Sequence, residues 1–454
     1  MTLSDQTTPV VPFHRLDPAL LDQARVEMQS DGIPGLALGV YYDGHAATAG
    51  LGVTNLMHPQ PVSGETLFQI ASITKTFTAT AVLQLVEKGR INLDDPVRAH
   101  LPEFAVVDPD VSASVTIRHC LTHCCGWEGD FYEDPGWGDD ALAAIVGRMR
   151  KLVQVTPLGK IWSYNNAAFY VLGRILEVLH GRTFEAVLND TLLTPLGIHG
   201  TCFFAHELVH RNFAVGHSEV RRQRVIARPC VMPRCGNPIG GLIASAEHLM
   251  LYARFQLEGA SVLGDAMRLA AFEPAGPSND VPEIGLGWWL DDTYGERVVS
   301  HGGGANGQPC FFAMVPSRRF AIAVLTNGEK GSTTAQRLLS WAMRTYFGLA
   351  VPALRSQRHA ISDDWVGTYE TCLERHVLRR KGEGLVYDQS TIKEWLEGLD
   401  PPPTPEIGRR VKAIGPDTMR IAPGERTQCV GTVLRDESGE ARWLRIKHRA
   451  ALRR

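Results

Sequence analysis

ASITKTFTATAVLQLVEK, residues 71–88, predicts a helix that is apolar on most of its sides and ends at Gly89. A helix of that kind is buried, so the remainder of the chain has to surround it. Ser72 and Lys75 lie at its start, and residues three apart on a helix share one face. The segment therefore forms both a structural centre and a candidate pair of reactive side chains.

Strand patterns lie on both sides of this helix in the sequence. Residues 35–42 and 46–52 surround Asp43-Gly44, which is typical of a β-hairpin. Further strand candidates return only after a long interval, at residues 298–301, 310–315 and 320–326. Between the two groups the chain is mainly helical, with a short helix capped by Thr116 and stopped by Gly126, a helix at residues 166–180 and another that opens at Thr183. Two further helices are predicted outside the strand groups, at residues 16–30 and 333–347. This order predicts an α+β fold, in which one antiparallel sheet is built from both ends of residues 1–350, is flanked by helices and carries a helical insertion.

The last hundred residues have a different character. Residues 351–360 are expected to be a linker, and residues 361–454 a small all-β barrel or sandwich. Pro401-Pro402-Pro403 marks a loop within that part. The strand candidates are residues 365–370, 376–380, 385–387, 410–414, 419–421, 429–434 and 443–446.

Composition restricts the class of protein. The chain has 454 residues, a net charge of -3 and a pI near 6.6, which give neither a nucleic-acid footprint nor a polybasic membrane patch. The first residues lack a signal-peptide pattern, and no run approaches about 18 consecutive apolar residues, so a cytoplasmic protein without a membrane partner is expected. The nine cysteines are scattered and odd in number, which favours reduced thiols. Neither Cys124-Cys125 nor the pair Cys230 and Cys235 has zinc-finger partners nearby, so no metal site is expected.

Ser72 and Lys75 form the spacing S-x-x-K. The lysine amine can reach the serine hydroxyl across one helical turn, and a weak nucleophile needs such a neighbouring base. The helix N-terminus adds unpaired N–H groups that favour a developing negative charge. The same spacing also arises by chance, as it does at Ser390 and Lys393 in the β-rich part, where nothing supports it.

Tyr164 and Asn166 form a Y-x-N. In an extended loop, residues two apart point to the same side, so a phenol and a carboxamide can converge on one site. The phenol can relay a proton, while the amide can hold a substrate carbonyl and the lysine. The alternative is structural: Tyr164 packs its ring, and Asn166 serves as the N-cap of the following helix.

His301-Gly302-Gly303-Gly304 follows a strand and precedes a glycine-rich turn. Glycines let a backbone approach a ligand closely, and a backbone N–H from this strand could join that of Ser72 in an oxyanion hole. The alternative is a strand end with a flexible loop.

The order and spacing of these three motifs resemble those of the serine β-lactamase and penicillin-binding peptidase superfamily. The similarity is to the branch that contains class C β-lactamases, soluble D,D-peptidases, D-aminopeptidases and related esterases, and it covers about residues 15 to 350. Supporting segments lie at residues 65–75, 89–97, 116–123, 240–245 and 285–288. The C-terminal part resembles, more weakly, the β-barrel modules appended to several such peptidases.

This resemblance implies a fold and a set of roles. Residues 1–350 would be a β-lactamase/transpeptidase-like catalytic domain in which Ser72 attacks a carbonyl and forms an acyl-enzyme. Lys75 and Tyr164 would share proton transfer, and Asn166 would position lysine and substrate. His301 and Gly303 would line the strand side, and the backbone N–H groups of Ser72 and Gly304 would form the oxyanion hole. The resemblance implies no cofactor, a small-molecule or short-peptide substrate, and an assembly that could be a homo-oligomer.

Departures from the family pattern bear on the substrate. β-Lactamases of the family usually have lysine where His301 stands, and a histidine supplies only a partial charge, which argues against efficient β-lactam hydrolysis. Cys124-Cys125-Gly126 replaces the usual Thr-Ser-Gly, either as a thiol near the pocket or, as we favour, as small residues packed under a loop. The aromatic and acidic residues 126–140 form either a rim loop or a solvated surface loop.

The function expected is hydrolysis of a small peptide, amide or ester, with D-amino-acid-containing substrates included. D-Aminopeptidase or D,D-peptidase, carboxylesterase and weak β-lactamase activities remain open alternatives. A non-catalytic relative that binds a ligand is a further alternative, against which the intact motifs argue.

Overall fold

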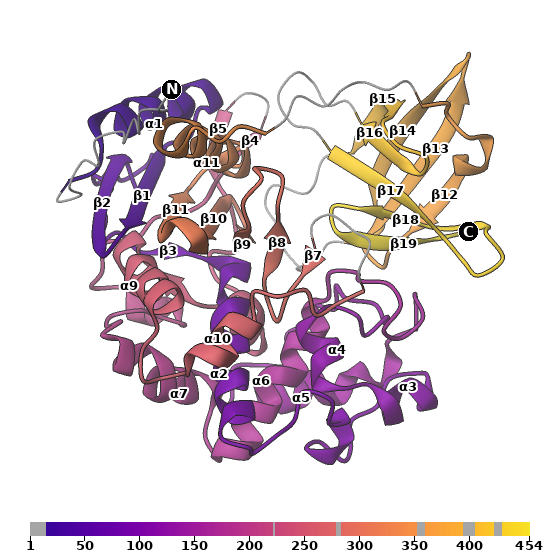
Figure 1. The fold of residues 1–454 in the computed structure, drawn as a ribbon, viewed down its shortest axis with the longest axis horizontal. Coiled ribbons are helices and arrows are strands. Elements are labelled where there is room, and N and C mark those ends of the chain that lie inside the picture. The colour runs from indigo at the N-terminus through magenta and orange to yellow at the C-terminus, as the bar shows by residue number, and fades with distance from the viewer. Residues whose placement is uncertain (1–14, 221–222, 278–282, 352–358, 394–404, 422–428) are drawn as a thin grey trace, which may run out of the picture.

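The computed structural model describes residues 15–220, 223–277, 283–351, 359–393, 405–421 and 429–454. A seven-stranded sheet forms the centre of the larger part, in the order β2-β1-β11-β10-β9-β8-β7 (Figure 1). The N-terminal hairpin of β1 (Gly35–Tyr42) and β2 (His45–Gly52) joins the late strands because β1 pairs antiparallel with β11 (Phe320–Thr326). The other strands are β10 (Gln308–Val315), β9 (Val298–Ala305), β8 (Trp289–Asp291) and β7 (Glu283–Ile284). The predicted α+β fold with one sheet built from both ends is confirmed.

Both faces of the sheet are covered by helices. On one face, α1 (Pro18–Asp31) and α11 (Gly331–Phe347) pack in a cluster with Leu36, Leu38 and Val40 of β1. The alternate residues Ala37 and Tyr41 belong to the second and larger core, together with α9 (Ala246–Glu258). Successive side chains on a strand point to opposite faces, so β1 is apolar throughout because both of its faces are buried.

The helical insertion surrounds α2 (Thr74–Glu87), which is buried over most of its length as predicted. A short 3₁₀ turn at Ala71–Ile73 precedes α2, and Gly89 follows it with a φ of +64°, a left-handed conformation that glycine adopts readily. The other helices are α3 (Pro109–Ser114), α4 (Ile117–Leu121), α5 (Ala141–Arg148), α6 (Asn166–His180), α7 (Phe184–Leu188), α8 (Asn237–Gly240) and α10 (Asp265–Ala270). Thr116 caps α4 as predicted.

Two short strand pairings complete the larger part. The remaining strands are β3 (Phe68–Gln69) with β6 (Ile243–Ala244), and β4 (His217–Val220) with β5 (Gln223–Ile226). The pairing of β3 with β6 ties the segment before Ser72 to the segment after Gly240, so it helps to fix the start of α2. No helix in the described ranges is long and apolar enough to cross a bilayer.

The C-terminal strands close into an antiparallel barrel, so the barrel alternative of the prediction is confirmed and the sandwich is excluded. Its strands are β12 (Gly367–Glu370), β13 (Glu374–Lys381), β14 (Gly384–Thr391), β15 (Glu406–Ala413), β16 (Thr418–Ile421), β17 (Cys429–Arg435), β18 (Ala441–Ile446) and β19 (Arg449–Arg453). Large side chains such as Trp365, Tyr369 and Tyr387 fill its interior. The predicted loop at Pro401–Pro403 and most of the predicted linker at 351–360 lie outside the described residues.

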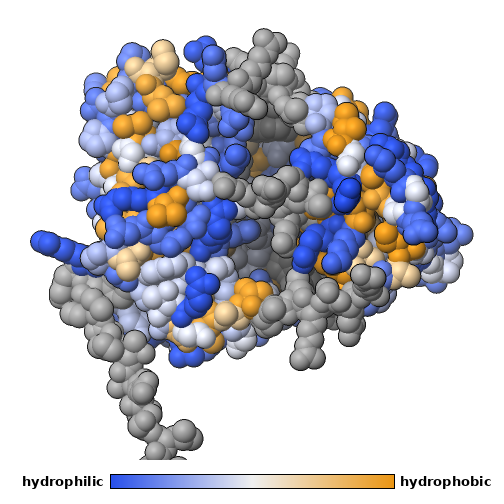
Figure 2. Space-filling model, turned by 90° about the horizontal axis from the view of Figure 1, so that it is seen from above, coloured by the Kyte–Doolittle hydropathy of each residue, from blue (hydrophilic) through white to orange (hydrophobic). Residues whose placement is uncertain are grey.

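The barrel lies beside the end of the sheet formed by β8 and β7, and above the helical insertion (Figure 1). Trp443 Nε1 donates to Val155 O at 2.8 Å, and Ala450 N donates to Ser163 Oγ at 3.0 Å. The β18–β19 turn thus reaches the loop that carries Tyr164. Apolar and polar residues are interspersed over the face shown in Figure 2, on the sheet side and on the barrel side alike.

Candidate active site

Ser72 lies in the 3₁₀ turn that leads into α2, and Lys75 follows in the first turn of α2. Lys75 Nζ lies 3.2 Å from Ser72 Oγ and donates to Ile239 O at 2.5 Å. The lysine side chain is fully buried, so its amine is directed at the serine and one backbone carbonyl. The S-x-x-K spacing brings the two reactive groups together as predicted.

The turn at Ser72 is held by close backbone packing. Ala71 has a φ of +46°, a left-handed conformation that is uncommon for a residue other than glycine. A Cβ at Gly303 would lie 2.2 Å from Ile70 O, so only glycine lets β9 approach the turn this closely. Gly304, the next residue, lines the same pocket as Ser72.

The histidine-glycine motif differs from its prediction in one respect. His301–Gly304 was expected at a strand end before a glycine-rich turn, but β9 runs through all four residues to Ala305, and the turn is Asn306-Gly307. The strand continues because β10 pairs with it along this length, with Phe312 opposite His301 and Pro309 opposite Gly304. The glycines thus form a flat strand edge beside Ser72 and not a loop.

Burial lowers the pKa of Lys75 well below its usual range. The charge of Arg449 lowers this pKa further, while Asp130 acts in the opposite direction. A lysine whose pKa is lowered gives up its proton more readily and can then accept one, so its environment suits a general base.

Tyr164 is buried beside Lys75, whose Nζ lies 5.2 Å from the centre of the phenol ring. The His123 ring packs against the phenol at 4.5 Å, and His448 O accepts a hydrogen bond from Tyr164 N at 2.8 Å. Burial raises the pKa of the phenol, an effect that the nearby Ser72 hydroxyl partly offsets. Among the described residues no group meets hydrogen-bond geometry with the Tyr164 hydroxyl, so the hydroxyl is available to a substrate atom or to Ser72.

Asn166 lines the pocket, but its amide does not hold the lysine. Asn166 Nδ2 donates to Asp130 Oδ1 at 2.8 Å and to Tyr132 OH at 2.6 Å, so Ile239 O takes the place expected of Asn166 beside Lys75. The N-cap of α6 is Asn165, whose Oδ1 accepts from Ala168 N, and the capping alternative at Asn166 was therefore wrong by one residue.

His301 is fully buried behind the pocket. Its ring stacks on Trp289 at 4.7 Å, and Nδ1 lies 2.6 Å from Gly302 O. Burial lowers the pKa of His301 to about 3, and the nearby Lys75 adds to this effect. His301 therefore carries no charge at neutral pH, where a partial charge was expected.

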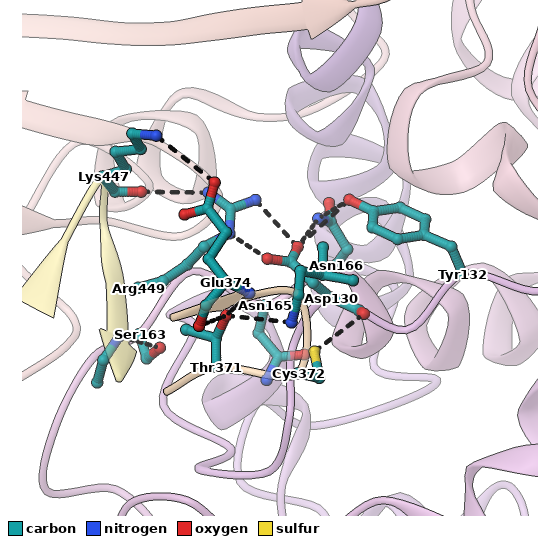
Figure 3. A network of polar contacts seen from close by, with 12 residues as sticks. Asp130, Tyr132, Ser163, Asn165, Asn166, Thr371, Cys372, Glu374, Lys447 and Arg449 are labelled. Carbon is teal, nitrogen blue, oxygen red and sulfur yellow. Dashed lines mark hydrogen bonds and ion pairs between the residues drawn. The ribbon is translucent and has the colours of Figure 1, made fainter. Parts of the chain in front are cut away.

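The pocket at Ser72 has a volume of about 230 Å³, and the barrel forms part of its wall. Ser72, Asn166 and Gly304 line it from the larger part, while Thr371, Leu373, Glu374, Lys447 and Arg449 line it from the barrel. Arg449 pairs with Asp130 through Nε and, at 3.0 Å, through Nη2 (Figure 3). Nothing in the sequence indicated these barrel residues, since none belongs to a motif with a recognisable spacing, and Asp130 was indicated only as one acidic residue of the possible rim loop 126–140.

The remaining candidates are resolved by burial and position. Cys124 and Cys125 are buried outside the pocket lining, and Cys125 Sγ lies 3.7 Å from Cys120 Sγ, which supports the packing alternative. The 126–140 loop contributes Asp130 and Tyr132 to the pocket wall, so part of it is a rim. Ser390 lies in β14 of the barrel, away from the lining. The described residues contain no cluster of three or more metal-ligating side chains.

Comparisons with known proteins agree on one family. The β-lactamase family model matches residues 22–342. Penicillin-binding protein 4 of Amycolatopsis lactamdurans is 33% identical over 333 residues, which cover 70% of this chain and 87% of that protein.

Two solved structures extend the likeness over the barrel. A structure of SurE with D-Leu matches with a TM-score of 0.73 at 22% identity, over 96% of this chain and 99% of that chain. The octameric penicillin-binding protein homologue from Pyrococcus abyssi matches with a TM-score of 0.66 at 21% identity, again over 96% and 99%. At such identities the two likenesses establish a shared fold, of which the barrel is part.

Proposed function

The chain belongs to the β-lactamase family, and on that premise we propose that it is a serine hydrolase that forms an acyl-enzyme on Ser72 and hydrolyses a small peptide, amide or ester. The observation that supports this most directly is the contact of Lys75 Nζ with Ser72 Oγ at 3.2 Å, at the wall of a pocket. The lowered pKa of the buried lysine further supports its role as the base.

In the proposed reaction, Lys75 removes the proton of Ser72 as Oγ attacks the substrate carbonyl. The backbone N–H groups of Ser72 and Gly304 stabilise the oxyanion, since both residues line the pocket. Tyr164 passes a proton to the leaving amine or alcohol, and its hydroxyl, which has no standard hydrogen bond among the described residues, suits this role. Water then cleaves the acyl-serine ester, which releases the acid and restores the Ser72 hydroxyl.

We place D-amino-acid-containing substrates before β-lactams. SurE, whose fold this chain shares, has been determined with D-Leu, and the neutral His301 provides no fixed charge for a β-lactam carboxylate. The pocket of about 230 Å³ suits a small residue better than a long acyl chain. Weak β-lactamase activity is the second candidate, because the family model carries that name. Asn166 and Gly303 are proposed to contribute to substrate binding and to the shape of the strand edge.

The experiment is a covalent label followed by a substrate panel. A fluorophosphonate or penicillin probe should add one acyl or phosphonyl group per chain, and mass spectrometry of the digest should place it on Ser72. A protein that takes up no stoichiometric label would be a binding relative. p-Nitroanilides and p-nitrophenyl esters of both chiralities, with nitrocefin beside them, would then order the substrates.

Assembly is a separate proposal. The octameric state of the Pyrococcus homologue supports a homo-oligomer for this chain as well. Light scattering coupled to size-exclusion chromatography would test it, and a mass near 49.9 kDa would contradict it.

A further inference from the structure

The β18–β19 turn brings Arg449 to the inner wall of the pocket, where Asp130 and Tyr164 meet it. Arg449 Cζ lies 5.0 Å from the centre of the Tyr164 ring, and the guanidinium is hydrogen-bonded to both carboxylate oxygens of Asp130. Arg449 Nη1 also donates to Lys447 O at 3.1 Å, which holds the side chain against its own turn. The cation is thus fixed in position beside the phenol.

Asp130 connects this cation to the second motif. Its Oδ1 accepts from Asn166 Nδ2 at 2.8 Å and lies 3.3 Å from Tyr132 OH. Burial alone would raise the pKa of this carboxyl, but the charge and hydrogen bonds of Arg449, together with the hydrogen bonds from Asn166 and Tyr132, lower it overall and favour the ionised form. A continuous set of polar contacts therefore runs from the barrel through Asp130 to Asn166 (Figure 3).

The other titratable groups around Lys75 and Tyr164 are neutral or further away. Burial lowers the pKa of His123 well below its usual range, that of His301 to about 3, and that of His448 to about 4. Glu374 and Lys447 lie at the barrel rim, where their charged groups are 3.5 Å apart and partly exposed. The buried Arg445 lies over the Trp162 ring, whereas Arg449, with Asp130 as its counter-ion, contacts the Tyr164 ring, and its charge acts on Lys75.

We propose that Arg449 is a positioning residue of the Ser72 site, a fixed positive charge that the barrel brings to Tyr164 and Asp130. Arg449 acts through two neighbours. It orients Asn166 by way of Asp130, and it favours the neutral form of Lys75 and a transient negative charge on the Tyr164 oxygen. The active site is then complete only when the barrel is docked. This inference rests on the proposed function of Ser72 and Lys75.

The test uses opposite charges on the two members of the pair. Arg449→Met removes a cation, so protonated Lys75 becomes easier to form and the acid limb of the reaction should move to higher pH. Asp130→Asn removes an anion, so the acid limb should move to lower pH. The double variant should lie between the two. If Arg449 had a purely structural role, both single variants would react more slowly, but their acid limbs would not move in opposite directions.

The measurement is the second-order rate of fluorophosphonate labelling of Ser72 in the full chain, followed from pH 5 to 9, a window around the pKa values usual for general bases. We expect shifts of at least about half a pH unit in opposite directions, so that on the acid limb Arg449→Met reacts roughly threefold or more slowly than the wild type at the same pH. Arg449→Lys, which keeps the charge, should retain the wild-type position of the acid limb. Arg379→Met is the matched control, because Arg379 forms an exposed pair with Asp388 elsewhere on the barrel.

The outcomes separate the two proposals. If wild-type Ser72 takes up no label, the proposed function fails. If Ser72 is labelled but the two acid limbs move together or not at all, the role of Arg449 fails. A rise in KM for carboxylate-bearing substrates alone, without a pH shift, would instead make Arg449 a direct substrate contact and would also overturn the inference. If Arg449→Met loses its thermal transition, Arg449→Lys and Asp130→Asn still test the direction of the shift.

Discussion

The Ser72 turn and the β18–β19 turn meet at one pocket but are held there by different means. The Ser72 turn belongs to the core of the larger part, where α2 is buried and β9 packs directly on the backbone at Ile70. The β18–β19 turn is anchored by hydrogen bonds from Trp443, Ala450 and Tyr164 N and by the ion pair of Arg449 with Asp130. A packed core tolerates little displacement, whereas a docked turn can change its geometry through a few polar contacts. In the proposed mechanism the bond-forming residues thus lie in the rigid Ser72 turn, and the charge that adjusts their pKa values lies in the docked β18–β19 turn.

The largest effect is expected at the rigid region. Ser72→Ala should lower kcat by at least about 10³-fold without a change in thermal unfolding, because its hydroxyl is the group proposed to bond to substrate. Steady-state hydrolysis of the best p-nitrophenyl ester and a thermal melt are the measurements. Ser390→Ala, in the second S-x-x-K, should leave both unchanged. Wild-type-like turnover of Ser72→Ala would contradict the assignment of the chemistry to the Ser72 turn.

Tyr164 lies where the two regions touch, so its variant tests both. Tyr164→Phe should lower kcat by about 10² to 10⁴-fold, the usual contribution of a positioned proton donor, while the ring contacts with His123 and Arg449 persist. The loss should be smaller for a p-nitrophenyl ester than for a p-nitroanilide, because nitrophenolate leaves without a proton. Equal losses on both substrates would indicate that Tyr164 acts by packing.

A smaller change is expected from His301. His301→Lys adds a fixed charge, worth on the order of a few kcal/mol to a carboxylate about 4 Å away before the cost of desolvation. The ratio of kcat/KM for nitrocefin to that for a neutral ester should therefore rise about tenfold, since about 1.4 kcal/mol is tenfold. An unchanged ratio would show that His301 does not set charge preference. His301→Gln, which keeps the site neutral, serves as the control.

The smallest effect concerns the acid stability of the docked turn. The pKa of His448 is lowered to about 4 by burial and by Arg449 and Arg445, whereas an unfolded histidine titrates near about 6.5. Between these values the unfolded chain binds more protons, so stability is full above about pH 6.5 and falls as the pH falls towards 4. His448→Gln should reduce this slope by up to about 1.4 kcal/mol per pH unit, measured by urea unfolding from pH 4 to 7. The same slope reduction in His58→Gln, an exposed site, would contradict the assignment to His448.

The sequence predicted those parts of the site that depend on short spacings. Ser72 with Lys75, and Tyr164 with Asn166, are each set by one turn or one short loop, and the structure brings all four to one region. The hairpin at Asp43-Gly44 and the alternation along the C-terminal strands likewise follow from local periodicity. In each of these cases, residues close together in the sequence are sufficient to predict the local structure.

The parts that were missed depend on contacts between distant segments. Asp130 and Arg449 are 319 residues apart, and neither stands in a motif, so their pairing follows only from the way the barrel docks. The contact with Lys75 that was expected of Asn166 is made by Ile239 O for the same reason, because Asn166 Nδ2 donates to Asp130. A glycine run normally indicates a turn, and β9 continues through it only because β10 pairs alongside.

The pairing of β1 with β11 has a consequence for synthesis on the ribosome. Leu36 finds its partner Thr326 roughly 290 residues later. At about 5 to 20 residues per second, the apolar hairpin of β1 and β2 waits roughly 15 to 60 seconds for the strand that completes its sheet. Throughout that interval the edge of β1 that pairs with β11 is open, although α1, which is made first, can already pack on one face of the hairpin; the nascent hairpin therefore exposes a strand edge to wrong partners.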